Sequence, residues 1–276
     1  MRKVAVITGA SRGIGRAIAI NFAKKNYDIV LAAKSIENTK LLPGSILTVK
    51  NEIKKLYPNT RILPVQTDIR SEKSIKSLVN EIRTNFDRVD VLINNASALY
   101  WTPIEETYAK KYDLIQEVNT RGSFLMSKYI LPIMKSQGSG DIIMHSPPID
   151  LNSIGGLTAY MISKYGMTMT ALGIAQEYKH LNIRANTIWP ATMIESYATI
   201  NNNLGDRKLW RKPDIIVDAI NHILEEDKKF SGNMLIDEDY LKQKGIKDFS
   251  KYRCVSDSEP PRISELWGDL LKNVRK

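Results

Sequence analysis

The chain has 276 residues, of which 43% are hydrophobic and 25% are charged, proportions that are ordinary for a soluble globular protein. A chain of this length can bury most of its surface without disulfide bridges, and its single cysteine, Cys254, excludes an internal one, which fits a reducing compartment. We see no secretory signal and no run of about twenty apolar residues, so we expect a cytoplasmic protein that does not span a membrane.

The net charge is +10, which by itself would suit a nucleic-acid-binding protein. The lysines, however, are scattered among acidic residues on helical stretches such as 71–88 (SEKSIKSLVNEIRTNFDR). That pattern is typical of a solvated helix face, so we expect no nucleic-acid partner. The excess positive charge can instead attract an anionic ligand from a distance.

Short apolar runs alternate with longer helical patterns along the chain. The apolar runs are rich in Val and Ile and lack polar alternation, as strands covered on both faces do; we predict strands at 3–8, 27–33, 61–66, 89–94, 140–145, 183–188 and 233–237. Between them we predict helices at about 14–25, 45–56, 72–86, 105–136, 158–180 and 214–226. This alternation predicts an α/β fold, a doubly wound parallel sheet of about seven strands with helices on both faces.

No interior linker marks a domain boundary, so we expect one domain over residues 1–238. The remaining residues, 239–276, lack the alternating pattern. We expect them to form a C-terminal extension packed on the same domain, near the mouth of a substrate site.

A glycine-rich loop, TGASRGIG, follows the first predicted strand and contains Gly9, Gly13 and Gly15. Glycine permits a tight turn there and a close approach of the backbone to a pyrophosphate, which the N-terminus of the next helix attracts. Turns collect glycine in any case. Its place between the first strand and the first helix favours the dinucleotide-binding site of a Rossmann-type fold.

The end of the second predicted strand indicates which dinucleotide binds. NAD-binding Rossmann folds usually carry an acidic residue there for the ribose hydroxyls, but this chain reads LAAKS, with Ala33 followed by Lys34. Arg12 adds a second cation inside the glycine loop. The sequence therefore predicts that NADP(H) binds. The alternative is NAD(H), and Lys34 would then be an ordinary surface lysine.

A third pattern lies in HSPPIDLNSIGGLTAYMISKYGM, which begins at His145. Tyr160 and Lys164 stand one helical turn apart and share a helix face, and the preceding strand delivers Ser146 to the carboxyl edge of the sheet. A free tyrosine titrates near ~10, and a neighbouring ammonium favours its phenolate. The pattern thus predicts a proton-transferring tyrosine; Tyr240 and Lys244 repeat the spacing without a strand-borne serine, and we interpret that pair as chance.

Together, TGASRGIG, NNAS (94–97), Asn119 in EVNTRGSF, Ser146 and YMISK (160–164) resemble the classical short-chain dehydrogenase/reductase family over residues 3–237. More narrowly, HSPP, AYMISKYGM, IWPAT and SGNMLIDED are similar to its hydroxysteroid-dehydrogenase-like protein 2 branch. The resemblance implies an oxidoreductase that works as a homodimer or homotetramer.

The resemblance also implies roles for individual residues. Tyr160 exchanges a proton with the substrate oxygen, Lys164 bonds the nicotinamide ribose, Ser146 holds the substrate oxygen, and Asn119 holds a water that returns protons to Lys164. Cofactor contacts would come from Tyr160 and Lys164 and from these further residues: Thr8, Gly9, Ser11, Arg12, Gly13, Ile14 and Gly15 at the phosphates, Asp68 and Ile69 at the adenine, Asn95 and Ala96 at the ribose, Pro190 and Met193 at the nicotinamide.

Two positions depart from the family pattern. Ser97 stands where the family often has the glycine of Asn-Asn-Ala-Gly, and Pro147 follows Ser146 where the family often has a second serine. If the catalytic hydroxyl is the second of that pair, this chain lacks it; if it is the first, Ser146 remains. We assign Ser146.

We therefore expect an NADP(H)-dependent enzyme that interconverts a carbonyl and a primary or secondary alcohol. The predicted substrate loop, 191–212, carries an apolar set that suits a lipid-, steroid- or terpenoid-like substrate: Met193, Ile194, Tyr197, Ile200 and Leu204. The alternative is a dinucleotide-binding sensor or scaffold without turnover. We expect no metal, because the three histidines have no ligand spacing with one another or with Cys254.

Overall fold

The computed structural model describes residues 2–38, 43–152 and 154–266 and contains one central parallel sheet of seven strands. Its strands run in the order β3-β2-β1-β4-β5-β6-β9. Their bounds are β1 Val4–Thr8, β2 Asp28–Ala33, β3 Ile62–Gln66, β4 Val91–Asn94, β5 Gly140–Met144, β6 Ile183–Trp189 and β9 Met234–Ile236. The doubly wound fold predicted from the alternation is confirmed.

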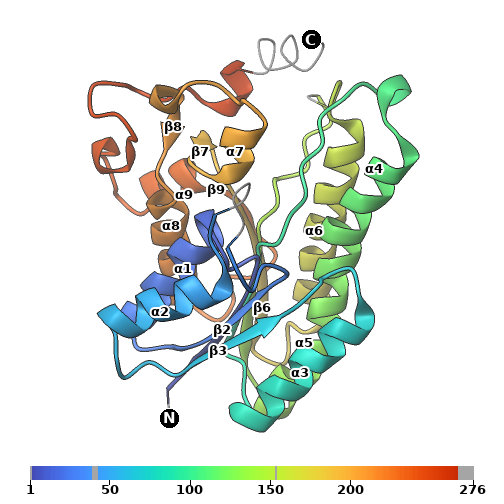
Figure 1. Ribbon diagram of the computed structural model, residues 1–276, viewed down its shortest axis with the longest axis vertical. Coiled ribbons are helices and arrows are strands. Elements are labelled where there is room, and N and C mark those ends of the chain that lie inside the picture. Colours follow the sequence, from blue (N-terminus) through green and yellow to red (C-terminus); the bar gives the residue numbers. More distant parts are fainter. Residues whose placement is uncertain (1, 39–42, 153, 267–276) are drawn as a thin grey trace.

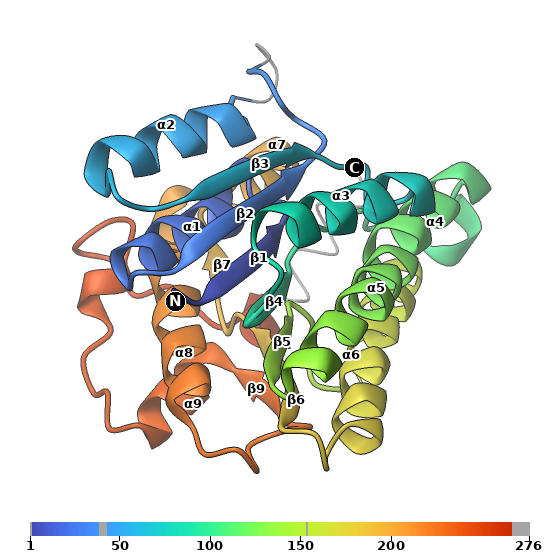
Figure 2. The same cartoon turned by 90° about the horizontal axis from the view of Figure 1, so that it is seen from below.

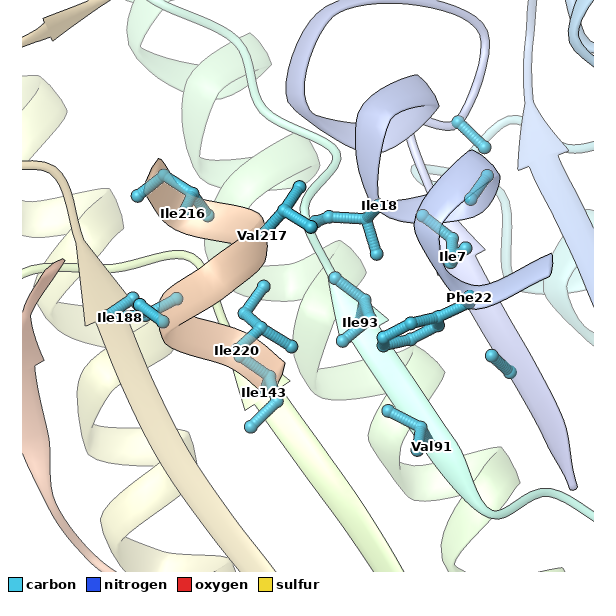
Figure 3. Close-up of a cluster of buried hydrophobic side chains, with 14 of the residues drawn as sticks. Ile7, Ile18, Phe22, Val91, Ile93, Ile143, Ile188, Ile216, Val217 and Ile220 are labelled. Atoms are coloured by element: carbon cyan, nitrogen blue, oxygen red, sulfur yellow. The ribbon is translucent and has the colours of Figure 1, made fainter. Parts of the chain in front are cut away.

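Helices cover both faces of this sheet (Figure 2). On one face lie α1 (Gly13–Lys24), α2 (Ile46–Leu56) and α8 (Asp214–Glu225); on the other lie α3 (Glu72–Asn85), α5 (Gly122–Gln137) and α6 (Thr158–Glu177). Figure 3 shows the hydrophobic core between the sheet and the first of these helix layers. In it, Ile18 and Phe22 of α1 and Ile220 of α8 pack with the strand residues Val91 and Ile143. Burying such apolar faces is the main driving force for folding.

The strand order reverses between β1 and β4, and this position determines where a ligand can bind. Ile7 of β1 pairs with Ile93 of β4, so the two chains leave the sheet side by side. In open α/β sheets, ligands bind in the crevice beyond the carboxyl ends of the strands at such a switch point. The glycine loop follows β1 and the Asn-Asn-Ala-Ser segment follows β4, so both lie at this crevice.

One predicted helix differs from the observed one. The stretch 105–136 begins instead as a 3₁₀ turn at Ile104–Glu106, followed by α4 (Ala109–Ile115), a π-helical turn (Gln116–Arg121) and then α5. An apolar pattern does not report a change from i→i−4 to i→i−5 hydrogen bonding, so the π turn could not be predicted from it.

Short elements near the carboxyl edge were also not predicted. They are β7 (Met193–Ile194), α7 (Tyr197–Asn201), β8 (Trp210–Arg211) and α9 (Asp237–Gln243); β7 and β8 form a separate two-stranded sheet (Figure 1). Each is too short for a periodic pattern to stand out from neighbouring residues.

The segment after residue 238 packs against the domain as far as the structure describes it. Tyr240 and Tyr252 are buried in the core beneath α8. Further along, Ile263 donates its N–H to the carbonyl of Ala191 at 2.7 Å, which brings the segment beside the β6–β7 connection. The boundary at residue 238 stays a prediction, and residues 267–276 lie outside the described residues.

We predict opposite effects for the same substitution at two helical glycines. A Cβ at Gly15 would lie 2.4 Å from the backbone oxygen of Gly9, whereas a Cβ at Gly173 meets only Glu177 Oε1 at 4.0 Å. Gly15→Ala should lower the free energy of unfolding by about 1–3 kcal/mol through overpacking. Gly173→Ala should raise it by about 0.5–1 kcal/mol. Denaturant unfolding measures both, and a stabilising Gly15→Ala would contradict the packing argument.

Candidate active site

A cavity of about 780 Å³ opens at the carboxyl edge of the sheet, within the size range of small-molecule sites. It runs from the glycine loop past the end of β4 to α6, and on to the segment 189–204 and residues 262–264. Of the residues predicted for the apolar substrate set, Met193, Ile194, Tyr197 and Leu204 line it and Ile200 does not. Of the residues predicted as catalytic or cofactor-binding, those that line it are Gly9, Ser11, Arg12, Gly13, Ile14, Asn95, Ala96, Tyr160, Lys164, Pro190 and Met193. Seven others are not in its wall: Thr8, Gly15, Lys34, Asp68, Ile69, Asn119 and Ser146.

The glycine loop has the geometry that a pyrophosphate requires. Gly9 and Gly13 have φ of +65° and +54°, a region that side chains with a Cβ rarely adopt. A Cβ at Gly9 would also lie 2.9 Å from the Cα of Ala96. Helix α1 begins at Gly13 with no side-chain cap, which leaves its first N–H groups directed at the cavity. The loop therefore fits a dinucleotide phosphate.

Two buried nitrogen atoms in the cavity wall have no hydrogen-bond partner among the described residues. They are Nε of Arg12 and Nε2 of His145. Buried polar atoms are normally paired, so such atoms are expected where a ligand binds. Burial, with the Lys164 ammonium nearby, lowers the pKa of His145 to about 3, so this imidazole is neutral. Its Nδ1 donates to Asn95 Oδ1 at 3.3 Å, which leaves Nε2 as a hydrogen-bond acceptor.

Arg12 is held at the end of β2. Its guanidinium donates to the Ser35 hydroxyl at 2.9 Å and to the carbonyl of Gly44 at 2.8 Å. Burial lowers the pKa of Arg12, with Tyr197 opposing that shift. Ser35 was not predicted as a site residue. It directly follows Lys34 in LAAKS, the stretch whose lack of an acidic residue indicated NADP(H), so that stretch was the signal that could have found it.

Lys34 and Asp68 lie beside this end of β2 rather than in the cavity wall. The Lys34 ammonium is 3.6 Å from the Asp68 carboxylate. Asp68 is held more closely by Arg70, whose hydrogen bonds lower the pKa of Asp68 to about 2. Ile69 packs tightly on Gly122, where an added Cβ would be 2.6 Å from its Cγ1.

Thr8 joins the two chain segments that leave the sheet at the switch point. Its hydroxyl accepts from the N–H groups of Asn95 and Ala96, both at 3.0 Å, and donates to the carbonyl of Ile93 at 3.2 Å. The Asn95 amide in turn donates to the carbonyl of Thr8 at 2.9 Å. These bonds fix the floor of the cavity.

Tyr160 and Lys164 project from the first turns of α6 into the cavity, and their side chains are almost completely buried. The Lys164 ammonium donates to the carbonyl of His145 at 3.0 Å and lies 5.8 Å from the centroid of the Tyr160 ring. It takes part in no ion pair with another described residue. Burial therefore lowers the pKa of Lys164 to about 7. Burial also raises the pKa of Tyr160 far above its usual value, while a hydrogen bond to Ser97 acts in the opposite direction.

Asn119 lies in the π-helical turn and supports the cavity from behind. Its amide oxygen accepts from the N–H of Ala98 at 2.8 Å, and its amide nitrogen donates to the carbonyl of Ala98 and to Ser163 Oγ, both at 2.9 Å. Both amide protons are used in this way, and the residue is fully buried. Asn119 thus fixes the segment after β4 against α6.

Ser146 is not part of the cavity wall to which Tyr160 belongs. The Ser146 hydroxyl is fully buried and accepts from Thr168 Oγ1 of α6 at 2.9 Å. Its neighbours His145, Pro147 and Pro148 form the cavity wall instead. Thr168 Oγ1 also lies 2.7 Å from the carbonyl oxygen of Pro147, so this turn is packed against α6 and the Ser146 hydroxyl is not in the cavity wall. The role of this hydroxyl at the substrate oxygen stays a prediction, and in this structure the hydroxyl lies outside the cavity wall.

The family model for short chain dehydrogenase matches residues 3–204, and the chain belongs to that family. It is 43% identical over 257 residues to hydroxysteroid dehydrogenase-like protein 2 of Xenopus laevis, a match that covers 92% of this chain and 61% of that protein. The chain thus spans about three fifths of the length of this curated relative. The predicted resemblance to the family and to this branch is confirmed.

Solved structures agree with this assignment. A crystal structure of a short chain dehydrogenase from Mycobacterium thermoresistibile is 37% identical, with a TM-score of 0.87 and coverage of 94% of this chain and 93% of that one. A metagenomic short-chain oxidoreductase in complex with NADP is 25% identical, with a TM-score of 0.70 and coverage of 85% and 96%. Among the described residues no group of His, Cys, Asp or Glu could hold a metal ion, and none of the described helices has the length and apolar character to cross a membrane.

The buried Lys164 predicts a pH-dependent stability of the cofactor-free protein. Its pKa falls from 10.5 when unfolded to about 7 when folded, so between these values the unfolded chain binds one proton more. The stability cost of Lys164 therefore grows as the pH falls through this window, by up to about 1.4 kcal/mol per pH unit. Relative to Lys164→Met, the wild type should gain stability from pH 7 to 10 in denaturant unfolding. A difference between the two proteins that stays constant with pH would contradict this.

Proposed function

We propose that the protein is an NADP(H)-dependent oxidoreductase that interconverts a carbonyl and a primary or secondary alcohol by hydride transfer. One observation carries the proposal: Tyr160 and Lys164 lie together in the wall of a cavity that is continuous with the glycine loop. A dinucleotide bound to that loop would extend along the cavity toward the phenol. Membership of the short chain dehydrogenase family supports the same reaction class.

The preference for NADP(H) rests on the charges at the end of β2. Arg12 is directed there by Ser35 and Gly44, and Lys34 lies nearby. Ala33 takes the place of the acidic residue that would hold a ribose hydroxyl and repel a phosphate. The metagenomic neighbour solved with NADP is consistent with this preference. Guanidinium groups suit a phosphate because they donate several hydrogen bonds from one rigid plane.

The residues around the phenol suggest how the reaction proceeds. When bound, NADPH supplies the hydride that is added to the carbonyl carbon. The Tyr160 phenol gives its proton to the oxygen, and Lys164 stabilises the phenolate that remains. In the opposite direction the phenolate removes the proton of the alcohol. The backbone carbonyl of His145 accepts from Lys164 at 3.0 Å and so helps to hold the ammonium in the cavity wall.

The outer part of the cavity suits an apolar substrate. Its wall there is contributed by the segment after β4, by α6, by the segment 191–204 and by the C-terminal segment. The large apolar residues in this wall are Leu99, Trp101, Met161, Met193, Ile194, Leu204 and Ile263. We propose a lipid-, steroid- or terpenoid-like carbonyl or alcohol as the substrate class.

A second candidate function is a dinucleotide-binding sensor or scaffold without turnover. The observation that favours it is the position of Ser146, whose hydroxyl does not reach the cavity. The two functions make different predictions, because a sensor binds NADPH tightly but reduces no carbonyl.

We also propose that the protein forms a homodimer or homotetramer through α5 and α6. Phe124 on α5 and Ile162 and Met169 on α6 are large apolar side chains that are 53%, 47% and 58% exposed. Large apolar side chains exposed on two neighbouring helices are expected to be covered by another chain.

Tyr160→Phe should abolish most of the turnover while leaving NADPH binding intact. Loss of a general acid typically costs about 10²–10⁴-fold in kcat, measured as loss of nicotinamide absorbance with a panel of ketones and aldehydes. Tyr178→Phe, at the far end of α6 and outside the cavity wall, is the control. The sensor would be favoured if the wild type binds NADPH but turns over no compound, and if Tyr160→Phe behaves like the wild type in both measurements.

Arg12→Ala should weaken binding of NADPH much more than binding of NADH. A hydrogen bond to a charged group is worth about 1.5–3 kcal/mol, so the Kd for NADPH should rise about 10–100-fold. The Kd for NADH should change by less than about threefold, because NADH has no phosphate at this position. Fluorescence titration measures both, and Arg16→Ala, which removes a surface ion pair with Glu52, serves as the control. An equal loss for the two dinucleotides would refute the NADP preference.

A further inference from the structure

The cavity wall after β5 carries a proline where the family often carries a serine. The serine pair of the family corresponds here to Ser146 and Pro147, and of these two only Pro147 lines the cavity. Proline has neither a hydroxyl nor a backbone N–H to offer to a substrate oxygen. Since Ser146 is committed to Thr168, the segment 146–148 contributes no side-chain donor to the substrate oxygen.

A different hydroxyl lies in the same cavity as the phenol, on the segment that follows β4. Ser97 is exposed and lines the same cavity as Tyr160, and its hydroxyl donates to the carbonyl of Ala98 at 3.4 Å. It also acts on the phenol, because its hydroxyl lowers the pKa of Tyr160 against the effect of burial. It is the second departure from the family pattern, which often has glycine at this position. The two departures are therefore opposite in effect: one removes a hydroxyl from the cavity wall, and the other adds one next to Tyr160.

The position of Ser97 is fixed by its neighbours. The next residue, Ala98, is bracketed by Asn119, which accepts from its N–H at 2.8 Å and donates to its carbonyl at 2.9 Å. Further along, Trp101 packs edge-on against the Tyr160 ring, with centroids 6.3 Å apart. The segment that carries Ser97 is thus held to α6 just after the serine, as a preorganised donor requires.

We propose that Ser97 is a catalytic residue, whose hydroxyl binds the substrate oxygen beside Tyr160 in place of the missing serine after β5. The inference rests on the proposed oxidoreductase function. During reduction the hydride adds to the carbonyl carbon, the electron pair of the C=O π bond moves to oxygen, and the phenol of Tyr160 delivers the proton that completes the alcohol. Ser97 keeps its own proton throughout and only donates a hydrogen bond to the oxygen while negative charge develops there.

Removal of this hydroxyl provides the main test. In Ser97→Ala and Ser97→Gly, kcat/KM for a carbonyl that the wild type reduces with NADPH should fall about 10²–10³-fold, as for the loss of one oxyanion donor. The Kd for NADPH should stay within about threefold. The pH profile of alcohol oxidation should shift to higher pH in these variants, because Ser97 holds the pKa of Tyr160 down. Ser97→Thr, which keeps a hydroxyl, should retain most of the activity.

Moving the hydroxyl from position 97 to position 147 provides a second test. If Ser97 had only a structural role, a hydroxyl at position 147 would not restore activity. Pro147→Ser, added to Ser97→Ala, returns a hydroxyl to the position where the family often has it and should recover at least tenfold of the lost kcat/KM. Ser146→Ala removes the other serine and should act through thermal stability, because it breaks a buried hydrogen bond to Thr168.

The outcomes separate this inference from the proposed function. Wild-type protein that binds NADPH but reduces no carbonyl would refute the oxidoreductase function itself. Wild-type turnover that is unaffected by Ser97→Ala, or a larger fall in kcat/KM for Ser146→Ala than for Ser97→Ala, would overturn the role of Ser97 and leave the oxidoreductase function standing.

Discussion

The close packing of the β1–α1 turn against the end of β4 is the constraint on which the site depends. Gly9 approaches Ala96 so closely that a single added carbon would collide with its backbone, and Gly15 approaches the carbonyl of Gly9 in the same way. The hydroxyl of Thr8 ties the two segments together where they leave the sheet. The glycine loop and the segment that carries Ser97 are therefore one rigid unit, and the distance between the proposed cofactor and substrate ends of the cavity follows from the parallel sheet.

Burial, rather than ion pairing, shifts the pKa values of Tyr160 and Lys164. Lys164 is buried against the carbonyl of His145 and faces no carboxylate among the described residues, so its pKa falls to about 7. Burial drives Tyr160 the same way, toward its neutral form. Burying a lysine and a tyrosine in this way lowers the free energy of unfolding. A polar ligand that accepts a hydrogen bond from the ammonium and lies next to the phenol would give both groups a partner and so explains why they are buried here.

Sequence patterns predicted the parts of the molecule that obey a regular period or a strict steric rule. The seven strands and the glycine loop belong to this class, because burial on two faces and positive φ leave few alternatives. Patterns did not predict the direction of single side chains: Ser146 follows a strand as expected, yet its hydroxyl turns to Thr168. Nor did they predict Ser35, since its contact with Arg12 joins residues 23 positions apart. Such contacts depend on tertiary packing, which no local window contains.

The far wall of the cavity is held by charges rather than by the sheet. The buried carboxylate of Asp237 accepts from the N–H of Ala191 at 2.8 Å, just after β6. Glu238 pairs with Arg211 of β8, and Asp239 with Arg262, which itself lines the cavity. These links fasten the segment after β6 and the C-terminal segment to the start of α9. None of these linked residues belongs to the seven strands of the sheet, so this wall can change its side chains while the floor of the cavity at β1 and β4 stays as it is. Specificity is therefore expected to reside in this charged frame and in the apolar residues that it supports.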